Sequence, residues 1–175
     1  MLLPDIEVFD PIQYKLNKRV YLTQEAKDAV IAHILPEEEQ LAERDSIETH
    51  LREAIRAAHE EFEGTEASYP IVGFVLHGSW IHGTADPDSD VDVFPLVTRH
   101  GYIDYLRDVK ERVRQQGLTK ELGFASRIFL EERDGIVRLL ENGYKVISPF
   151  PEIEENAPGI LNEMIAFEKE NGYLP

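Results

Sequence analysis

The spacing of apolar residues predicts helices in the N-terminal third of the chain. Thr23 suits the cap of a helix over Gln24 to Leu35, and Pro36 suits the first turn of a second helix that ends at Gly64. In this second helix, apolar residues recur every three or four positions: Ile47, Leu51, Ile55, Ala58 and Phe62. Residues 1–22 alternate apolar and polar side chains in places, which predicts a short edge strand or an ordered arm.

Beyond Pro70, short apolar runs alternate with amphipathic segments. The runs predict strands over Ile71 to His77, Val91 to Val97, Phe124 to Leu130 and Tyr144 to Ser148. The segments predict helices over Tyr102 to Gln116, Glu131 to Asn142 and Pro158 to Glu170. Such alternation predicts an α/β (α+β) fold, in which helices flank a small mixed sheet of about four strands.

Length and composition are typical of one globular domain. The chain has 175 residues, 42% hydrophobic and 30% charged, so one core is expected. We divide the domain into an N-terminal arm with helices (1–69), a core (70–150) and a C-terminal helix (151–175). The sequence contains no cysteine, which excludes disulfides, thiolate metal sites and a cysteine nucleophile.

The start of the chain and its apolar stretches predict a cytoplasmic protein without a membrane segment. Asp5 and Glu7 stand where a signal peptide carries positive charge. The densest apolar stretch, Ile71 to Leu76, is much shorter than the ~20 residues that a membrane helix needs.

The charge balance narrows the expected partners. With 34 acidic and 18 basic residues the formal net charge is −16, which repels a phosphate backbone, so long nucleic acid is not an expected partner. Cations and basic proteins are compatible with this charge. The acidic face of the helix between Glu37 and Glu63 leaves two interpretations open, a solvated surface or a docking face for a basic partner.

The residues with the clearest chemistry lie between Val75 and Val97. An apolar strand leads into Gly78 and Ser79, and the next strand opens with Asp90 and Asp92. Alternate residues of a strand project from the same face, so two carboxylates roughly 7 Å apart could share Mg²⁺ or Mn²⁺. Gly78 would let the backbone approach a phosphate chain, the Ser79 hydroxyl could donate to it, and the start of a following helix would add positive charge.

Three other interpretations of this window are possible. Asp86 and Asp88 are typical turn residues and are assigned to a turn. A calcium-binding EF-hand loop does not fit, because Val91 and Val97 occupy the positions of its glycine and bidentate glutamate. Asp90 and Asp92 could also line a solvated edge strand, which the preceding Gly78-Ser79 pair disfavours.

The pattern resembles the signature of the polymerase-β nucleotidyltransferase superfamily: an apolar strand into Gly78-Ser79, ten residues, and then Asp90-Val-Asp92. It is most similar to the minimal nucleotidyltransferases. The resemblance implies a nucleotidyltransferase-like fold, metal on Asp90 and Asp92, and a nucleoside triphosphate held near Gly78 and Ser79. It implies transfer of a nucleoside monophosphate, AMP from ATP in our interpretation, to a protein, an RNA end or a small-molecule hydroxyl.

The chain departs from the family's pattern at several positions. Trp80 and His82 stand where members often carry arginine, and Arg127 falls on or next to the position of a third carboxylate. Glu131 is the substitute that we assign as a catalytic residue. An alternative function is therefore a catalytically silent protein of this fold, a nucleotide-binding or antitoxin-like interaction partner. His33, His50, His59 and His100 show no metal-ligand spacing and are expected to be surface or capping residues, whereas His77 could be either a buried histidine or a site residue.

Overall fold

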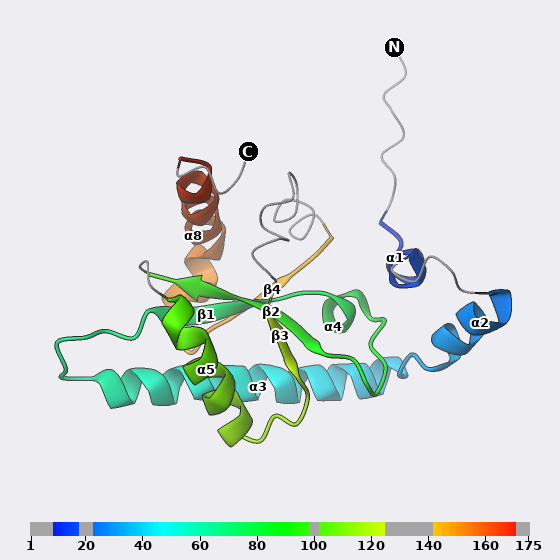
Figure 1. Ribbon diagram of the computed structural model, residues 1–175, viewed down its shortest axis with the longest axis horizontal. Helices are drawn as coiled ribbons and strands as arrows, with labels where there is room; N and C mark the ends of the chain where they lie inside the picture. The colour runs from blue at the N-terminus through cyan, green and yellow to red at the C-terminus, as the bar shows by residue number, and fades with distance from the viewer. Residues whose placement is uncertain (1–8, 18–22, 99–101, 125–141, 171–175) are drawn as a thin grey trace, which may run out of the picture.

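The computed structural model describes residues 9–17, 23–98, 102–124 and 142–170, which form a four-stranded sheet flanked by helices (Figure 1). In chain order the elements are α1 (Pro11–Asn17), α2 (Gln24–Ala32), α3 (Glu37–Phe62), β1 (Ile71–Leu76), α4 (Ser79–His82), β2 (Val91–Val97), α5 (Ile103–Gln115), β3 (Leu122–Phe124), β4 (Lys145–Ile147) and α8 (Pro151–Glu170). The predicted fold class, a mixed sheet of four strands flanked by helices, is confirmed.

The strand order is β3-β2-β1-β4. β1 pairs antiparallel with both β2 and β4, whereas β2 pairs parallel with β3. Every residue of β1 is buried, as expected for a central strand covered on both faces. The third predicted strand begins earlier than expected, at Leu122. Residues 125–141, which hold the rest of that predicted strand and most of the helix expected over Glu131 to Asn142, lie outside the described residues.

One face of the sheet packs against α3 and α5 (Figure 1). The predicted apolar stripe of α3 enters this core: Ile47, Leu51, Ile55 and Ala58 are buried, and Phe62 packs against them. Phe74 and Leu76 of β1 and Val91 and Val93 of β2 belong to the same cluster. The helix that precedes the predicted core thus supplies one wall of it.

The other face of the sheet packs against α8. Leu161 joins Val75 of β1 and Phe94 of β2 in a second apolar cluster. The prediction that this helix starts at Pro158 is wrong, since it starts at Pro151. Proline suits the first position, and an apolar stripe of Ile153, Ala157 and Leu161 continues through the first turns. Neither α8 nor any other helix in the described ranges is both long and apolar enough to cross a membrane.

The short edge strand expected in the N-terminal segment is wrong over Pro11–Asn17, because these residues are helical. Asp10 caps this helix by accepting hydrogen bonds from the amides of Ile12 (2.9 Å) and Gln13 (3.2 Å), and Pro11 occupies its first position. The predicted Thr23 cap of α2 is confirmed by its bond from the Ala26 amide at 3.2 Å. That helix ends at Ala32 rather than Leu35.

The two leucines of α3 allow its packing to be tested. Leu51 is completely buried, whereas Leu41 is 43% exposed. We expect Leu51→Ala to lower the free energy of unfolding by about 3 kcal/mol, because it removes apolar contacts and leaves a cavity. The matched change Leu41→Ala should stay within about 0.5 kcal/mol. Urea denaturation measures both, and equal losses would contradict the placement of α3 in the core.

Candidate functional site

The register between β1 and β2 brings Gly78 against Asp92. Leu76 lies opposite Val93, and the next amide, that of His77, donates to the Asp92 carbonyl at 3.0 Å. Gly78 has φ 72° and ψ −149°, a conformation that is nearly restricted to glycine. A Cβ at this position would overlap Oδ2 of Asp92 and lie 3.1 Å from its Cγ. The glycine is needed both for its backbone and for the space that it leaves to a carboxylate.

A second glycine, not identified from the sequence, lies on the other side of the same carboxylate. Gly123 of β3 pairs with Asp92 in the parallel ladder, and a Cβ there would lie 3.4 Å from Asp92 Oδ1. A single glycine in a short segment carries little sequence signal. Only the pairing of β2 with β3 shows that it flanks the site.

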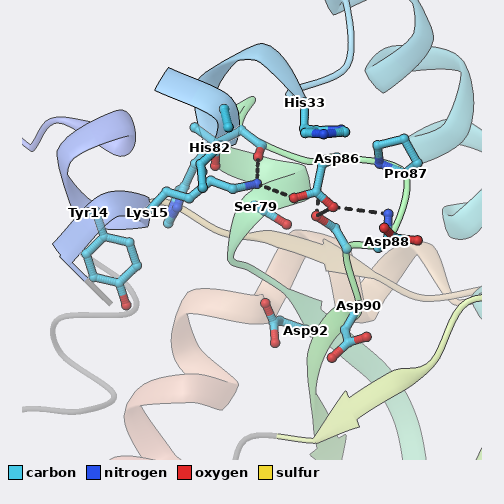
Figure 2. A pocket seen from close by; sticks show the side chains of 14 residues that line it. Tyr14, Lys15, His33, Ser79, His82, Asp86, Pro87, Asp88, Asp90 and Asp92 are labelled. Carbon is cyan, nitrogen blue, oxygen red and sulfur yellow. Dashed lines mark hydrogen bonds and ion pairs between the residues drawn. The ribbon is translucent and has the colours of Figure 1, made fainter. Parts of the chain in front are cut away.

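Asp90 and Asp92 project toward one cavity, as Figure 2 shows. Val91 and Val93 between and after them are completely buried, which confirms the predicted alternation along this strand. Asp90 is exposed and Asp92 is half-buried. The sheet therefore places both carboxylates at the start of β2, where solvent and ligands can reach them.

The cavity has a volume of about 560 Å³. Its described lining residues are Tyr14, Lys15, Ala29, Val30, His33, Ser79, His82, Thr84, Asp86, Pro87, Asp88, Ser89, Asp90 and Asp92. Three of the site residues predicted from the sequence, Ser79, Asp90 and Asp92, are among them. The sequence did not identify the wall formed by α1 and α2, because that wall is more than forty residues distant from Ser79 in the chain.

The side chains of Trp80 and Lys120 anchor the loop between α4 and β2. Trp80, one of the departures from the family's pattern, is 2% exposed, and its indole N–H donates to the Asp90 carbonyl at 3.0 Å. Lys120 donates to the Pro87 carbonyl at 2.9 Å and lies over the Trp80 ring, 5.0 Å from its centroid. These contacts fix the backbone immediately before the strand that carries Asp92.

Gln40 of α3 anchors the beginning of the same loop. Its side-chain amide donates to the carbonyls of Leu35 (2.8 Å) and Gly83 (2.9 Å), and its oxygen accepts from the Ala85 amide at 3.3 Å. Gln40 is only 7% exposed, so these bonds satisfy polar groups that water does not reach. The sequence does not indicate this role, because a glutamine in an acidic helix gives no local signal.

Asp86 begins the predicted turn and also reaches α1. Its carboxylate accepts from the Asp88 amide and the Ser89 hydroxyl, and the Ser89 amide bonds to its carbonyl at 3.1 Å. Lys15 of α1 forms an ion pair with the same carboxylate at 2.8 Å and donates to the Thr84 carbonyl. Partial burial opposes the charge, but the hydrogen bond and the positive charge of Lys15 outweigh it and hold the pKa of Asp86 below its ordinary value.

Ser79 opens α4, a helix of four residues. The sequence predicts a helix start whose positive end would help to hold phosphate. A single turn adds little macrodipole, so phosphate binding here would depend on local donors such as the Ser79 hydroxyl.

Two histidines border the cavity. His82 packs edge to face on Phe9 and Tyr14, with ring centroids 4.7 Å and 5.7 Å apart. His33 caps the C-terminal end of α2 and is exposed, as expected for a surface or capping residue, and it also lines the cavity.

The donor set at Asp90 and Asp92 fits Mg²⁺ or Mn²⁺. Both ligands would be carboxylate oxygens, and the cavity beside them has room for the water and phosphate oxygens that complete the shell of such an ion. Within residues 9–17, 23–98, 102–124 and 142–170, no group of three or more His, Asp or Glu side chains is arranged to hold a metal. Glu131 and Arg127, the positions considered for a third carboxylate, lie outside these ranges, so their roles remain predictions.

Comparison with known proteins adds no further assignment. The chain matches no protein-family model, and no curated protein is similar enough to it to count as a relative.

The two glycines that flank α4 provide a test of the close approach to Asp92. Gly78 and Gly83 share a φ of 72°, but nothing lies within 4 Å of a Cβ on Gly83. We expect Gly83→Ala to cost about 1 kcal/mol of unfolding free energy from backbone strain. Gly78→Ala should cost at least about 2 kcal/mol more, because it must also displace the Asp92 carboxylate. Chemical denaturation of the two variants measures the difference, and similar losses would contradict this packing.

Proposed function

We propose that this chain is a metal-dependent nucleotidyltransferase that transfers a nucleoside monophosphate, AMP from ATP, to a hydroxyl group of a protein, an RNA end or a small molecule. The observation that supports it best is the convergence of Asp90, Asp92 and Ser79 on one cavity, with Gly78 packed directly against the Asp92 carboxylate. This convergence comes from strand pairing in the tertiary structure. It is therefore a separate support from the sequence pattern.

In this proposal Asp90 and Asp92 hold Mg²⁺ or Mn²⁺. Bound there, the metal would neutralise charge on the triphosphate and polarise the α-phosphate. Hydrogen bonds to the backbone carbonyls hold both aspartates in place. Trp80 holds the Asp90 carbonyl, and the His77 amide holds the Asp92 carbonyl. Backbone anchors of this kind keep two mutually repelling carboxylates in position before substrate arrives.

The transfer is a substitution at the α-phosphorus. An acceptor hydroxyl oxygen forms the new bond to phosphorus, and the bond from phosphorus to the bridging oxygen breaks. Pyrophosphate leaves with that electron pair, and the acceptor proton passes to a base, the role considered for Glu131. The Ser79 hydroxyl would donate to the phosphate chain and orient it in line with the acceptor.

The alternative of a silent fold member that docks a basic protein through α3 receives no specific support. Several acids of α3 already form ion pairs within the chain: Glu43 with Lys120, Glu53 with Arg56 and Glu61 with Arg112, besides the buried Glu48 with Lys145. Such pairs lower the charge that a partner would meet. They fit a surface that stabilises the fold, and the alternative stays an untested prediction.

Labelled nucleotides test the proposal. The protein is incubated with nucleoside triphosphates labelled at the α-phosphate, Mg²⁺ and pools of hydroxyl-bearing acceptors, and labelled product and pyrophosphate are measured. We expect transfer by the unmodified chain and none by the Asp90→Asn/Asp92→Asn variant, which should also lose Mg²⁺-dependent triphosphate binding. Removing two like charges should leave the metal-free fold as stable as before or slightly more stable.

The control for this variant is Asp88→Asn, because Asp88 lies on the same loop and its side chain makes no assigned contact with the metal. It should bind triphosphate with the same Mg²⁺ dependence as the unmodified chain. A double variant at Asp90 and Asp92 that still bound triphosphate with unchanged Mg²⁺ dependence would remove the metal assignment.

A further inference from the structure

The cavity beside Asp90 and Asp92 is strongly acidic, yet it contains one lysine. Of the described residues that line it, four are aspartates and only Lys15 is a lysine or arginine. A triphosphate brings several negative charges, so its binding next to this wall needs positive charge besides the metal. The residues on either side of Ser79 do not supply this positive charge, because Gly78 has no side chain and Trp80 is uncharged and buried in the core.

Lys15 comes from α1, a helix that sequence analysis placed outside the catalytic region. Its side chain is 14% exposed and extends across the cavity edge to the Thr84 carbonyl and the Asp86 carboxylate. In the view of Figure 2, the Ser79 side chain is drawn between this ion pair and Asp92. The ammonium group thus borders the same cavity as the groups that would hold the metal and the phosphate chain.

The rest of α1 is fixed against the cavity rather than extended into solvent. Leu16 is buried, and Tyr14 packs edge to face against His82 of α4 at 5.7 Å between ring centroids. These contacts hold the backbone of α1 in place independently of the ion pair. Lys15 could therefore exchange partners by rotating its own side chain, without undocking of the helix.

Building on the proposed function, we propose that Lys15 is a substrate-binding residue that contacts the phosphate chain of the nucleotide, and that Asp86 holds it in place until substrate arrives. A lysine is a flexible point charge with three donors, which suits it to move from a carboxylate to a phosphate oxygen over a short distance. Asp86 is also held by the Asp88 amide and the Ser89 hydroxyl, so the loop keeps its turn when the lysine leaves.

If the Lys15–Asp86 ion pair is only structural, substitutions of the two residues should have the same effect; if Lys15 binds phosphate, they should have different effects. If the pair only fixes α1, loss of either charge loosens the helix equally. If Lys15 binds phosphate, Lys15→Met removes a favourable charge, whereas Asp86→Asn releases the lysine and removes a repulsive charge. Asparagine keeps an oxygen that can accept from the Asp88 amide, which preserves the turn.

The test measures binding of Mg²⁺ with inorganic tripolyphosphate, and with a non-hydrolysable ATP analogue, by calorimetry. We expect Lys15→Met to weaken both ligands by a similar factor, roughly tenfold, which is the effect of losing one charge-assisted hydrogen bond. Lys15→Arg should restore most of the affinity, and Asp86→Asn should bind both ligands at least as tightly as the unmodified chain. Lys27→Met, on α2 but outside the cavity lining, is the matched control and should change nothing.

The outcomes separate this inference from the proposed function. Unchanged binding by Lys15→Met, or equal weakening by Lys15→Met and Asp86→Asn, overturns the role of Lys15 and leaves the nucleotidyltransferase proposal intact. If the unmodified chain binds neither ligand with Mg²⁺, both fail. Weakening of the ATP analogue but not of tripolyphosphate would also overturn the inference, because Lys15 would then contact a part of the nucleotide other than the phosphates.

Discussion

The antiparallel register of β1 and β2 is the constraint on which the candidate site depends. It places Gly78, two residues after the end of β1, against the Asp92 carboxylate. It also orients Asp90 and Asp92 toward one cavity. A slip of one residue would exchange Asp92 with the buried Val91 or Val93. The apolar clusters on both faces of the sheet oppose such a slip, so the packing of the core and the geometry of the site have the same cause.

The loop between α4 and β2 has little regular structure, and side chains from distant elements hold it. Gln40 of α3 bonds its first residues, Trp80 and Lys120 hold its last carbonyls, and Lys15 of α1 approaches from the cavity side. Buried backbone groups need such partners, because an unsatisfied carbonyl costs about 1 to 3 kcal/mol. Side chains from several elements therefore determine together where Asp90 lies.

Ion pairs between elements offset part of the negative charge of the chain. With a net charge of −16, the acidic side chains of the chain repel one another. Acids of α3 reduce this repulsion by forming ion pairs with basic residues of other elements. Glu48 is the clearest case: its side chain is 5% exposed and bonds to Lys145 of β4 through both carboxylate oxygens, at 2.7 Å and 2.8 Å. This pair joins α3 to β4, the edge strand that adjoins β1. Part of the acidity that suggested a docking face thus holds the sheet to its helix.

What the sequence determined by itself is local. The three- and four-residue spacing from Ile47 to Phe62 predicted α3, the Thr23 cap predicted the start of α2, and the apolar runs predicted β1 and β2, in each case because the signal lies within one element. That Asp90 and Asp92 lie on the same face was predictable for the same reason, because side chains two residues apart in extended backbone project to the same side. Pro158 misled the prediction of α8, because a proline signals a helix start only when no upstream apolar stripe extends the helix.

Contacts between distant segments were decided by the tertiary structure alone. The sequence around Gly123 does not indicate that this glycine flanks Asp92 on the neighbouring strand. Likewise, the sequence around Gln40 and Lys15 does not indicate that these residues contact a loop some 40 to 70 positions away. The sequence does not predict α1 as a helix, because its seven residues are too few to show a period. Its place at the cavity follows from the burial of Leu16 and the contact of Tyr14 with His82. Local periodicity specifies elements and the faces they present, whereas the assembly of a site from several elements depends on which faces are buried together.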